Sequence, residues 1–156
     1  MSVFSAASRN QINIGLTVLR IVVGAIFIAH GGQKLFVFGL DGVAGGFAQM
    51  GVPMAGIVGP FIALLEFFGG MALIVGLLTR LASLGLASTM VVAILLVHLK
   101  AGFFNPNGIE FPLSLLAGSI FLALAGAGSW SIDALIGSRR PVPAAKAEVA
   151  NIRRAA

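Results

Sequence analysis

The sequence predicts an all-α, polytopic membrane protein, which we expect to form an antiparallel bundle of four transmembrane helices with a short interfacial segment after the first helix. Of the 156 residues, 58% are hydrophobic and only 10% are charged, whereas roughly a quarter of the residues of a soluble domain are charged. The mean hydropathy is +1.05. Apolar windows recur that have about the 20 residues a helix needs to cross a bilayer, and each is bounded by charged or turn-forming residues.

The four predicted spans cover residues 14–36, 55–78, 81–99 and 111–127. We interpret the first as a retained span and not as a secretory signal peptide. Arg20 interrupts its apolar region, and Phe27 stands where a cleavage site needs a small residue.

The connections between the spans differ in character. After the first span, apolar side chains recur at helical spacing behind a possible N-cap, Asp41: Leu40, Val43, Phe47 and Met50. The glycines around them disfavour a free helix, so we expect a short amphipathic turn in the membrane interface. The second connection, Leu78-Thr79-Arg80, permits only a tight helical hairpin. The third carries the turn signals Asn-Pro and Asn-Gly.

Residues 1–137 form the predicted transmembrane domain, and residues 138–156 form a basic, Pro-Ala-rich tail that we expect to be disordered. Lys and Arg in short loops set the orientation of such proteins. With both termini in the cytoplasm, only Lys34 and Lys100 lie outside, and the remaining loop cations lie inside: Arg9, Arg80, Arg139, Arg140, Lys146, Arg153 and Arg154. We therefore predict cytoplasmic N- and C-termini.

The composition excludes several kinds of chemistry. The chain has no cysteine, so disulfides, thiolate metal sites, iron–sulfur clusters and a dithiol relay of its own are excluded. The formal net charge of +5 is explained by a basic rim beside anionic lipid headgroups. We therefore expect the lipid bilayer as a partner and no nucleic acid.

Two ionisable side chains, Arg20 and Glu66, lie inside apolar spans, where each costs about 2.5–3.5 kcal/mol on insertion scales. We predict that they face inward and form a buried ion pair between neighbouring antiparallel helices. Such a pair could be purely structural and fix the helix register. Alternatively, Glu66 could handle protons or bind a ligand, or it could be neutral and donate a hydrogen bond to a backbone carbonyl.

Other polar residues gather at the predicted outer ends of the first and third spans and in the loop that follows. The histidines there could be packing residues, could ligate a haem b or a metal ion, or could bind a polar headgroup or a quinone carbonyl beneath phenylalanine rings. We favour the last kind of site, regard haem b as the weaker alternative, and predict no metal site. The candidate ligand-binding or proton-handling residues are Arg20, His30, Gln33, Lys34, Glu66, His98 and Glu110.

Three segments carry a resemblance to a known family: "RIVVGAIFIAHGGQKL" in the first span, "LEFFGGMALIVGLLTRLA" across the second and third, and "HLKAGFFNPNGIEFP" before the fourth. Together with the closing "SWSID", their order resembles the DoxX family of small bacterial integral membrane proteins. The resemblance implies a four-helix bundle in the bacterial cytoplasmic membrane. The family takes its name from a subunit of a thiosulfate:quinone oxidoreductase, and relatives are associated with redox stress and quinone-like aromatic compounds. Six polar residues match the family pattern by position: Arg20, Lys34, Glu66, Arg80, His98 and Glu110.

These observations lead us to expect a membrane component of a quinone-linked redox or oxidative-stress process that binds a quinone or another small lipophilic ring. A small proton-coupled transporter or export component is an alternative, and a noncatalytic scaffold for redox enzymes is another. The sequence assigns no catalytic residue. Glycine-rich helix faces also favour a homo-oligomer or a redox partner subunit.

Overall fold

The computed structural model describes residues 7–138, and every element in that range is helical. Of the predicted tail, residues 139–156 lie outside the described residues. The longer elements are α1 (Arg9–Gly32), α2 (Gly39–Gln49), α3 (Ala55–Val75), α4 (Thr79–Val92), α5 (Glu110–Ala125) and α6 (Ile132–Ser138). Short π-helical segments, η1 (Gln33–Phe38) and η2 (Ala93–His98), continue α1 and α4, and a 3₁₀ turn, η3 (Leu99–Ala101), follows η2.

The predicted all-α membrane class is confirmed. Three continuous helical stretches are long and apolar enough to cross a membrane: Arg9–Gln49, Ala55–Val75 and Thr79–Ala101. The fourth, α5, is apolar but has only 16 residues. The helix ends lie within a few residues of the predicted spans, except that the first helix begins earlier and continues into α2.

The segment after the first span is more regular than the predicted turn. It forms the 11-residue helix α2, although its glycines weaken a free helix. Its Val43 side chain is 4% exposed, and a Cβ at Gly59 of α3 would lie only 3.1 Å from it. Packing against α3 therefore stabilises a helix that local propensity alone does not favour.

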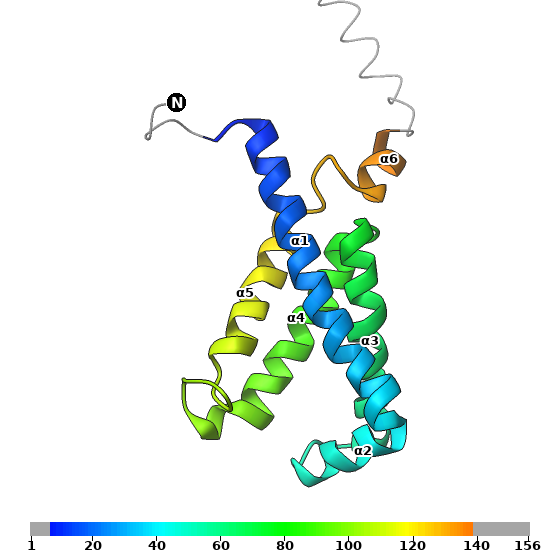
Figure 1. Cartoon of the computed structure of the whole chain (residues 1–156), viewed down its shortest axis with the longest axis vertical. Helices are drawn as coiled ribbons and strands as arrows, with labels where there is room; N and C mark the ends of the chain where they lie inside the picture. The colour runs from blue at the N-terminus through cyan, green and yellow to red at the C-terminus, as the bar shows by residue number, and fades with distance from the viewer. Residues whose placement is uncertain (1–6, 139–156) are drawn as a thin grey trace, which may run out of the picture.

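The helices are arranged as two pairs (Figure 1). α1 packs along α3, and α4 packs along α5. The pairs contact each other near the end that holds α6 and diverge toward the end that holds α2. Both the start of α1 and α6 lie at one end of the molecule, as an even number of crossings requires. Which side of the membrane this end faces stays a prediction.

Close contact between α1 and α3 depends on glycine. A Cβ at Gly24 would lie 2.7 Å from the Gly70 carbonyl oxygen, and one at Gly31 would lie 2.4 Å from the Phe67 backbone nitrogen. Small residues allow such backbone contact between membrane helices. The glycine-bearing face of α1 therefore looks into the bundle.

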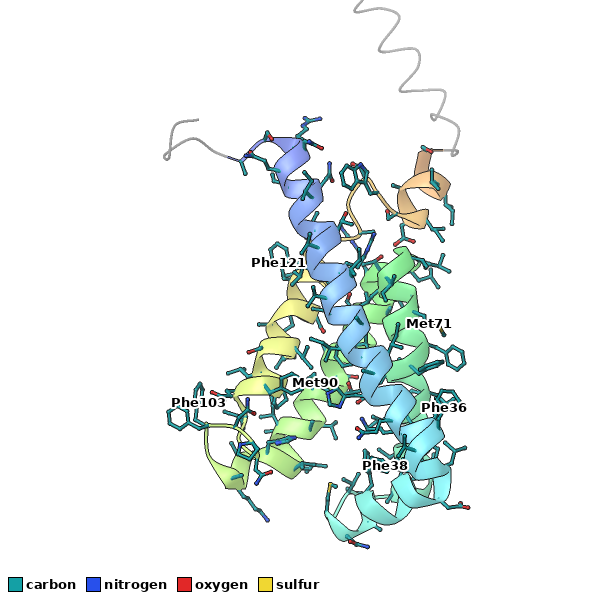
Figure 2. The ribbon with its side chains drawn as sticks, in the orientation of Figure 1. Phe36, Phe38, Met71, Met90, Phe103 and Phe121 are labelled. Atoms are coloured by element: carbon teal, nitrogen blue, oxygen red, sulfur yellow. The ribbon has the colours of Figure 1, made fainter. Side chains whose placement is uncertain are left out.

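Large apolar side chains cover the outside of the bundle. Phe36, Phe103 and Phe121 point away from the helices (Figure 2) and are 74%, 51% and 53% exposed, whereas Met90 lies inside and is 7% exposed. An apolar exterior around a small buried core is the distribution expected of helices surrounded by lipid.

Candidate functional site

A cavity of about 330 Å³ lies between the two helix pairs, in the half of the molecule that contains α2. Its volume is within the range of about 300–1,000 Å³ typical of small-molecule sites. Most of the lining is apolar, with contributions from α1 to α5 and from both π-helical segments. The polar lining residues are His30, Lys34, Glu66, Thr89 and His98.

Two of these polar residues, Lys34 and His98, belong to the π-helical segments η1 and η2. A π-helical turn holds an extra residue, which changes the direction of the side chains that follow, and such turns are frequent at functional sites. Both α1 and α4 run from the α6 end toward the cavity. Each of them changes from α-helical to π-helical winding where it reaches the cavity wall.

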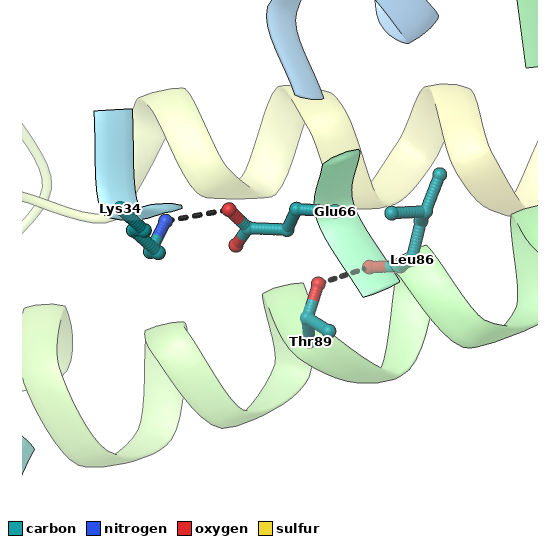
Figure 3. A network of polar contacts seen from close by, with 4 residues as sticks. All are labelled: Lys34, Glu66, Leu86 and Thr89. Atoms are coloured by element: carbon teal, nitrogen blue, oxygen red, sulfur yellow. Dashed lines mark hydrogen bonds and ion pairs between the residues drawn. The ribbon is translucent and has the colours of Figure 1, made fainter. Parts of the chain in front are cut away.

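Glu66 of α3 is paired with Lys34. The Lys34 ammonium donates to the carboxylate oxygen Oε2 of Glu66 (Figure 3). The two side chains are 19% and 5% exposed. The second carboxylate oxygen, Oε1, has no hydrogen-bond partner among residues 7–138. It is also absent from the set of unpaired polar atoms that the surrounding protein buries completely in that range. Because Glu66 lines the cavity and Oε1 is not enclosed by described residues, we infer that Oε1 is accessible from the cavity.

The predicted Arg20–Glu66 ion pair is wrong. The Arg20 guanidinium donates from Nη1 to the Ala127 carbonyl oxygen at 2.8 Å and from Nη2 to the Trp130 carbonyl oxygen at 2.7 Å. The reason is the register of α1 on α3. Phe67 lies beside Gly31, and the eleven residues from Arg20 to Gly31 correspond to about 16 Å of helix.

Arg20 instead holds the loop between α5 and α6 against α1, at the opposite end from the cavity, and Asp133 of α6 binds the α3–α4 connection beside it. Asp133 accepts hydrogen bonds from the Leu78 and Thr79 backbone N–H groups at 2.8 and 2.9 Å. Burial of the Asp133 carboxyl raises its pKa, but these N–H groups and the charge of Arg20 outweigh burial and leave the pKa below its usual value.

His98 and Glu110 both contact the loop between η3 and α5. Nδ1 of His98 lies 2.8 Å from the Asn107 carbonyl oxygen. A carbonyl only accepts, so Nδ1 carries a proton and Nε2 of the neutral ring is an acceptor. Glu110 does not line the cavity; its Oε1 accepts from the Asn105 backbone N–H at 2.8 Å.

The other two candidates differ in position. His30 lines the cavity, and its ring packs against Phe111 with a centroid distance of 5.7 Å. Gln33 is exposed and lies outside the lining. The structure therefore brings together four of the seven candidates at the cavity: His30, Lys34, Glu66 and His98. No group of three or more His, Cys, Asp or Glu within residues 7–138 could hold a metal ion.

Two polar residues with structural roles were not identified from the sequence. Thr89 is 4% exposed and donates to the Leu86 carbonyl oxygen at 2.8 Å in the cavity wall. It could have been noticed as one of the few polar residues in an apolar span. Asp133 could have been noticed as an acidic residue directly after the last span, where a helix N-terminus needs a partner.

Comparison with known proteins gives consistent matches. The DoxX family model matches residues 15–99. The chain is 36% identical to "Putative oxidoreductase CatD" of Bacillus subtilis, over 79% of this chain and 87% of that protein. It is 33% identical to "Inner membrane protein YqjF" of Escherichia coli, over 81% and 95%, and 34% identical to the membrane protein Rv3486 of Mycobacterium tuberculosis, over 78% and 80%. No solved structure matches the chain.

Proposed function

The chain belongs to the DoxX family of membrane proteins, and from this premise we propose that its cavity binds a quinone or a similar small lipophilic ring. The proposed setting is a quinone-linked redox or oxidative-stress process in the bacterial inner membrane. The names of two relatives, "Putative oxidoreductase CatD" and "Inner membrane protein YqjF", support this setting.

The observation that carries the proposal is a charged pair in the wall of a mostly apolar cavity. A lysine ammonium has three N–H donors, and among the described residues Lys34 uses one of them on Glu66. The others can bond to a ring carbonyl oxygen. Phe27 and Phe111 also line the cavity and offer apolar surface to the ring itself.

The pair suits a neutral lipophilic ligand. Lys34 and Glu66 together carry no net charge, so an uncharged ring can bind beside them without creating an unpaired charge in a medium of low dielectric constant. When bound, a quinone supplies the electron acceptor. The chain contains no cysteine, so we propose that electrons come from a soluble substrate or a redox partner subunit.

Binding is tested by titrating the purified protein, in a mild detergent, with menadione, a naphthoquinone without a tail. Quinones arylate thiols, and a chain without cysteine cannot give that artefact. We expect saturable binding near one ring per chain, measured by calorimetry. Lys34→Met removes a charge-assisted hydrogen bond worth about 1.5–3 kcal/mol, so the affinity should fall at least tenfold.

Lys100→Met is the matched control, because Lys100 carries the same charge but is exposed and does not line the cavity. Its affinity should equal that of the unchanged protein. The double variant Lys34→Met with Glu66→Gln leaves no unpaired carboxylate and checks that weak binding does not merely reflect misfolding. The proposal would be refuted if menadione uptake never saturated and, in every variant, equalled the uptake by empty detergent micelles.

A second candidate function is proton-coupled transport, which is favoured by a buried carboxylate facing a cavity within the membrane. In that case Glu66→Gln should abolish substrate movement driven by a pH gradient in liposomes and leave substrate binding in place. If the protein is instead a noncatalytic scaffold, the same change should affect only its stability.

A further inference from the structure

We infer that the cavity prefers the reduced, hydroxyl-bearing form of its ring ligand to the oxidised, carbonyl-bearing form. This inference rests on the proposed function and adds to it a redox-state specificity. It follows from which hydrogen-bonding atoms on the cavity wall still lack a partner.

Two of those atoms are acceptors. Oε1 of Glu66 is bonded to no described residue, although the whole residue is only 3% exposed. The neutral ring of His98 offers a second acceptor, Nε2, because the Asn107 carbonyl oxygen selects the tautomer with its proton on Nδ1. Both residues line the same cavity, and they come from different helices, α3 and η2.

The other polar groups of the wall do not satisfy these acceptors. The Thr89 hydroxyl proton is already directed at the Leu86 carbonyl oxygen (Figure 3). Lys34 donates to the other oxygen of Glu66, Oε2. His30 packs against Phe111 and has no hydrogen bond among the described residues. A donor for Glu66 Oε1 or His98 Nε2 must therefore come from water or from the ligand.

The two redox forms of a quinone differ in this respect. The oxidised ring has two carbonyl oxygens, which only accept, so it can bond to Lys34 but leaves both acceptors of the wall unpaired. The reduced ring has two hydroxyl groups, each of which donates one proton and still accepts from Lys34. Leaving one buried acceptor without a partner weakens binding by a factor of about ten or more.

The test compares menadione with its hydroquinone under anaerobic conditions, by calorimetry on the purified full chain. We expect the hydroquinone to bind at least about tenfold more tightly. Each factor of ten raises the midpoint potential of the bound two-electron couple by about 30 mV above that of the free couple. Spectroelectrochemical titration of the bound ring measures this shift independently.

Two variants test the assigned acceptors. In Glu66→Gln the amide oxygen can accept from Lys34 and the amide NH2 then faces the cavity, so the wall gains a donor and the preference should shift toward the oxidised ring. His98→Leu should lower the preference without reversing it. Lys100 lies on η3, close to His98 in the sequence, but does not line the cavity. Lys100→Gln should therefore leave the ratio of the two affinities unchanged.

A purely structural role for Glu66 would weaken both ring forms equally, so a changed ratio supports the inference even if stability also falls. Equal affinities for the two forms, or tighter binding of the oxidised form to the unchanged protein, would overturn the inference and leave ring binding intact. If neither form binds, the proposed function fails, and the inference fails with it.

Discussion

Separating Lys34 from Glu66 should destabilise the protein far more than removing both charges together. Glu66 is 3% exposed and Lys34 is its one partner among the described residues. Lys34→Met leaves a buried carboxylate alone, and removing one partner of a buried pair costs about 3–5 kcal/mol. Glu66→Gln should cost less, about 1–3 kcal/mol, because the Lys34 side chain is 19% exposed and can reach toward water.

The double variant contains neither buried charge, so its loss of stability should be smaller than the sum of the single losses. We expect a coupling free energy of about 2 kcal/mol in the double-mutant cycle, within the range for contacting residues. The assay is reversible unfolding in mixed micelles, followed by fluorescence. Trp130 is a clean reporter, because the chain has one tryptophan and no tyrosine.

Lys100→Met again serves as the control and should change stability by less than about 0.5 kcal/mol, as expected of an exposed charge. If the two single losses add to within about 0.5 kcal/mol of the double loss, the pair makes no energetic contribution and the reasoning from burial is wrong.

The remaining predictions concern the helix contacts and the α6 end. Arg20→Met, which leaves two carbonyl oxygens without their donor, should cost about 2–4 kcal/mol and shift Trp130 fluorescence; an unchanged spectrum and midpoint would contradict it. Gly31→Ala places a Cβ 2.4 Å from backbone and should cost about 1–3 kcal/mol, whereas Gly32→Ala, with nothing closer than 3.6 Å, should be neutral or stabilising in the same unfolding assay. The lowered pKa of Asp133 means that its stabilisation is present above the ordinary aspartate range, about pH 4, and is lost as pH falls through the folded-state pKa. Asp133→Asn should therefore lower the unfolding midpoint at pH 7 and flatten its decline in acid, and parallel curves for the two proteins would exclude this role.

The membrane class and the approximate helix positions could be predicted because hydropathy and helix length follow directly from local sequence. The length of α2 could not be predicted, because its glycines give it a low intrinsic helix propensity and packing against α3 stabilises it instead. The inward face of α1 was predictable from spacing, since Gly24 and Gly31 lie on the same face as Arg20.

The ion-pair partner of Glu66 was harder to predict from the sequence. Depth in the membrane pointed to Arg20 as the partner of Glu66, but close glycine contacts set a register that places Glu66 beside Lys34. Long side chains add to the difficulty, because arginine and lysine reach several ångströms along the helix axis. His98 and Lys34 were found as candidates from their position at helix ends, whereas their common cavity depends on π-helical turns that the sequence does not reveal.

The central claim, that a ring binds in the cavity between the helix pairs, is tested most directly by photolabelling. The detergent-solubilised protein is irradiated with an azido-naphthoquinone, and labelled peptides are mapped by mass spectrometry with excess menadione as competitor. Competed labels should fall on cavity-lining residues such as Phe27, Met90 and Phe111. Labels confined to the lipid-facing side chains, for example Phe36 and Phe121, and insensitive to the competitor would contradict the account.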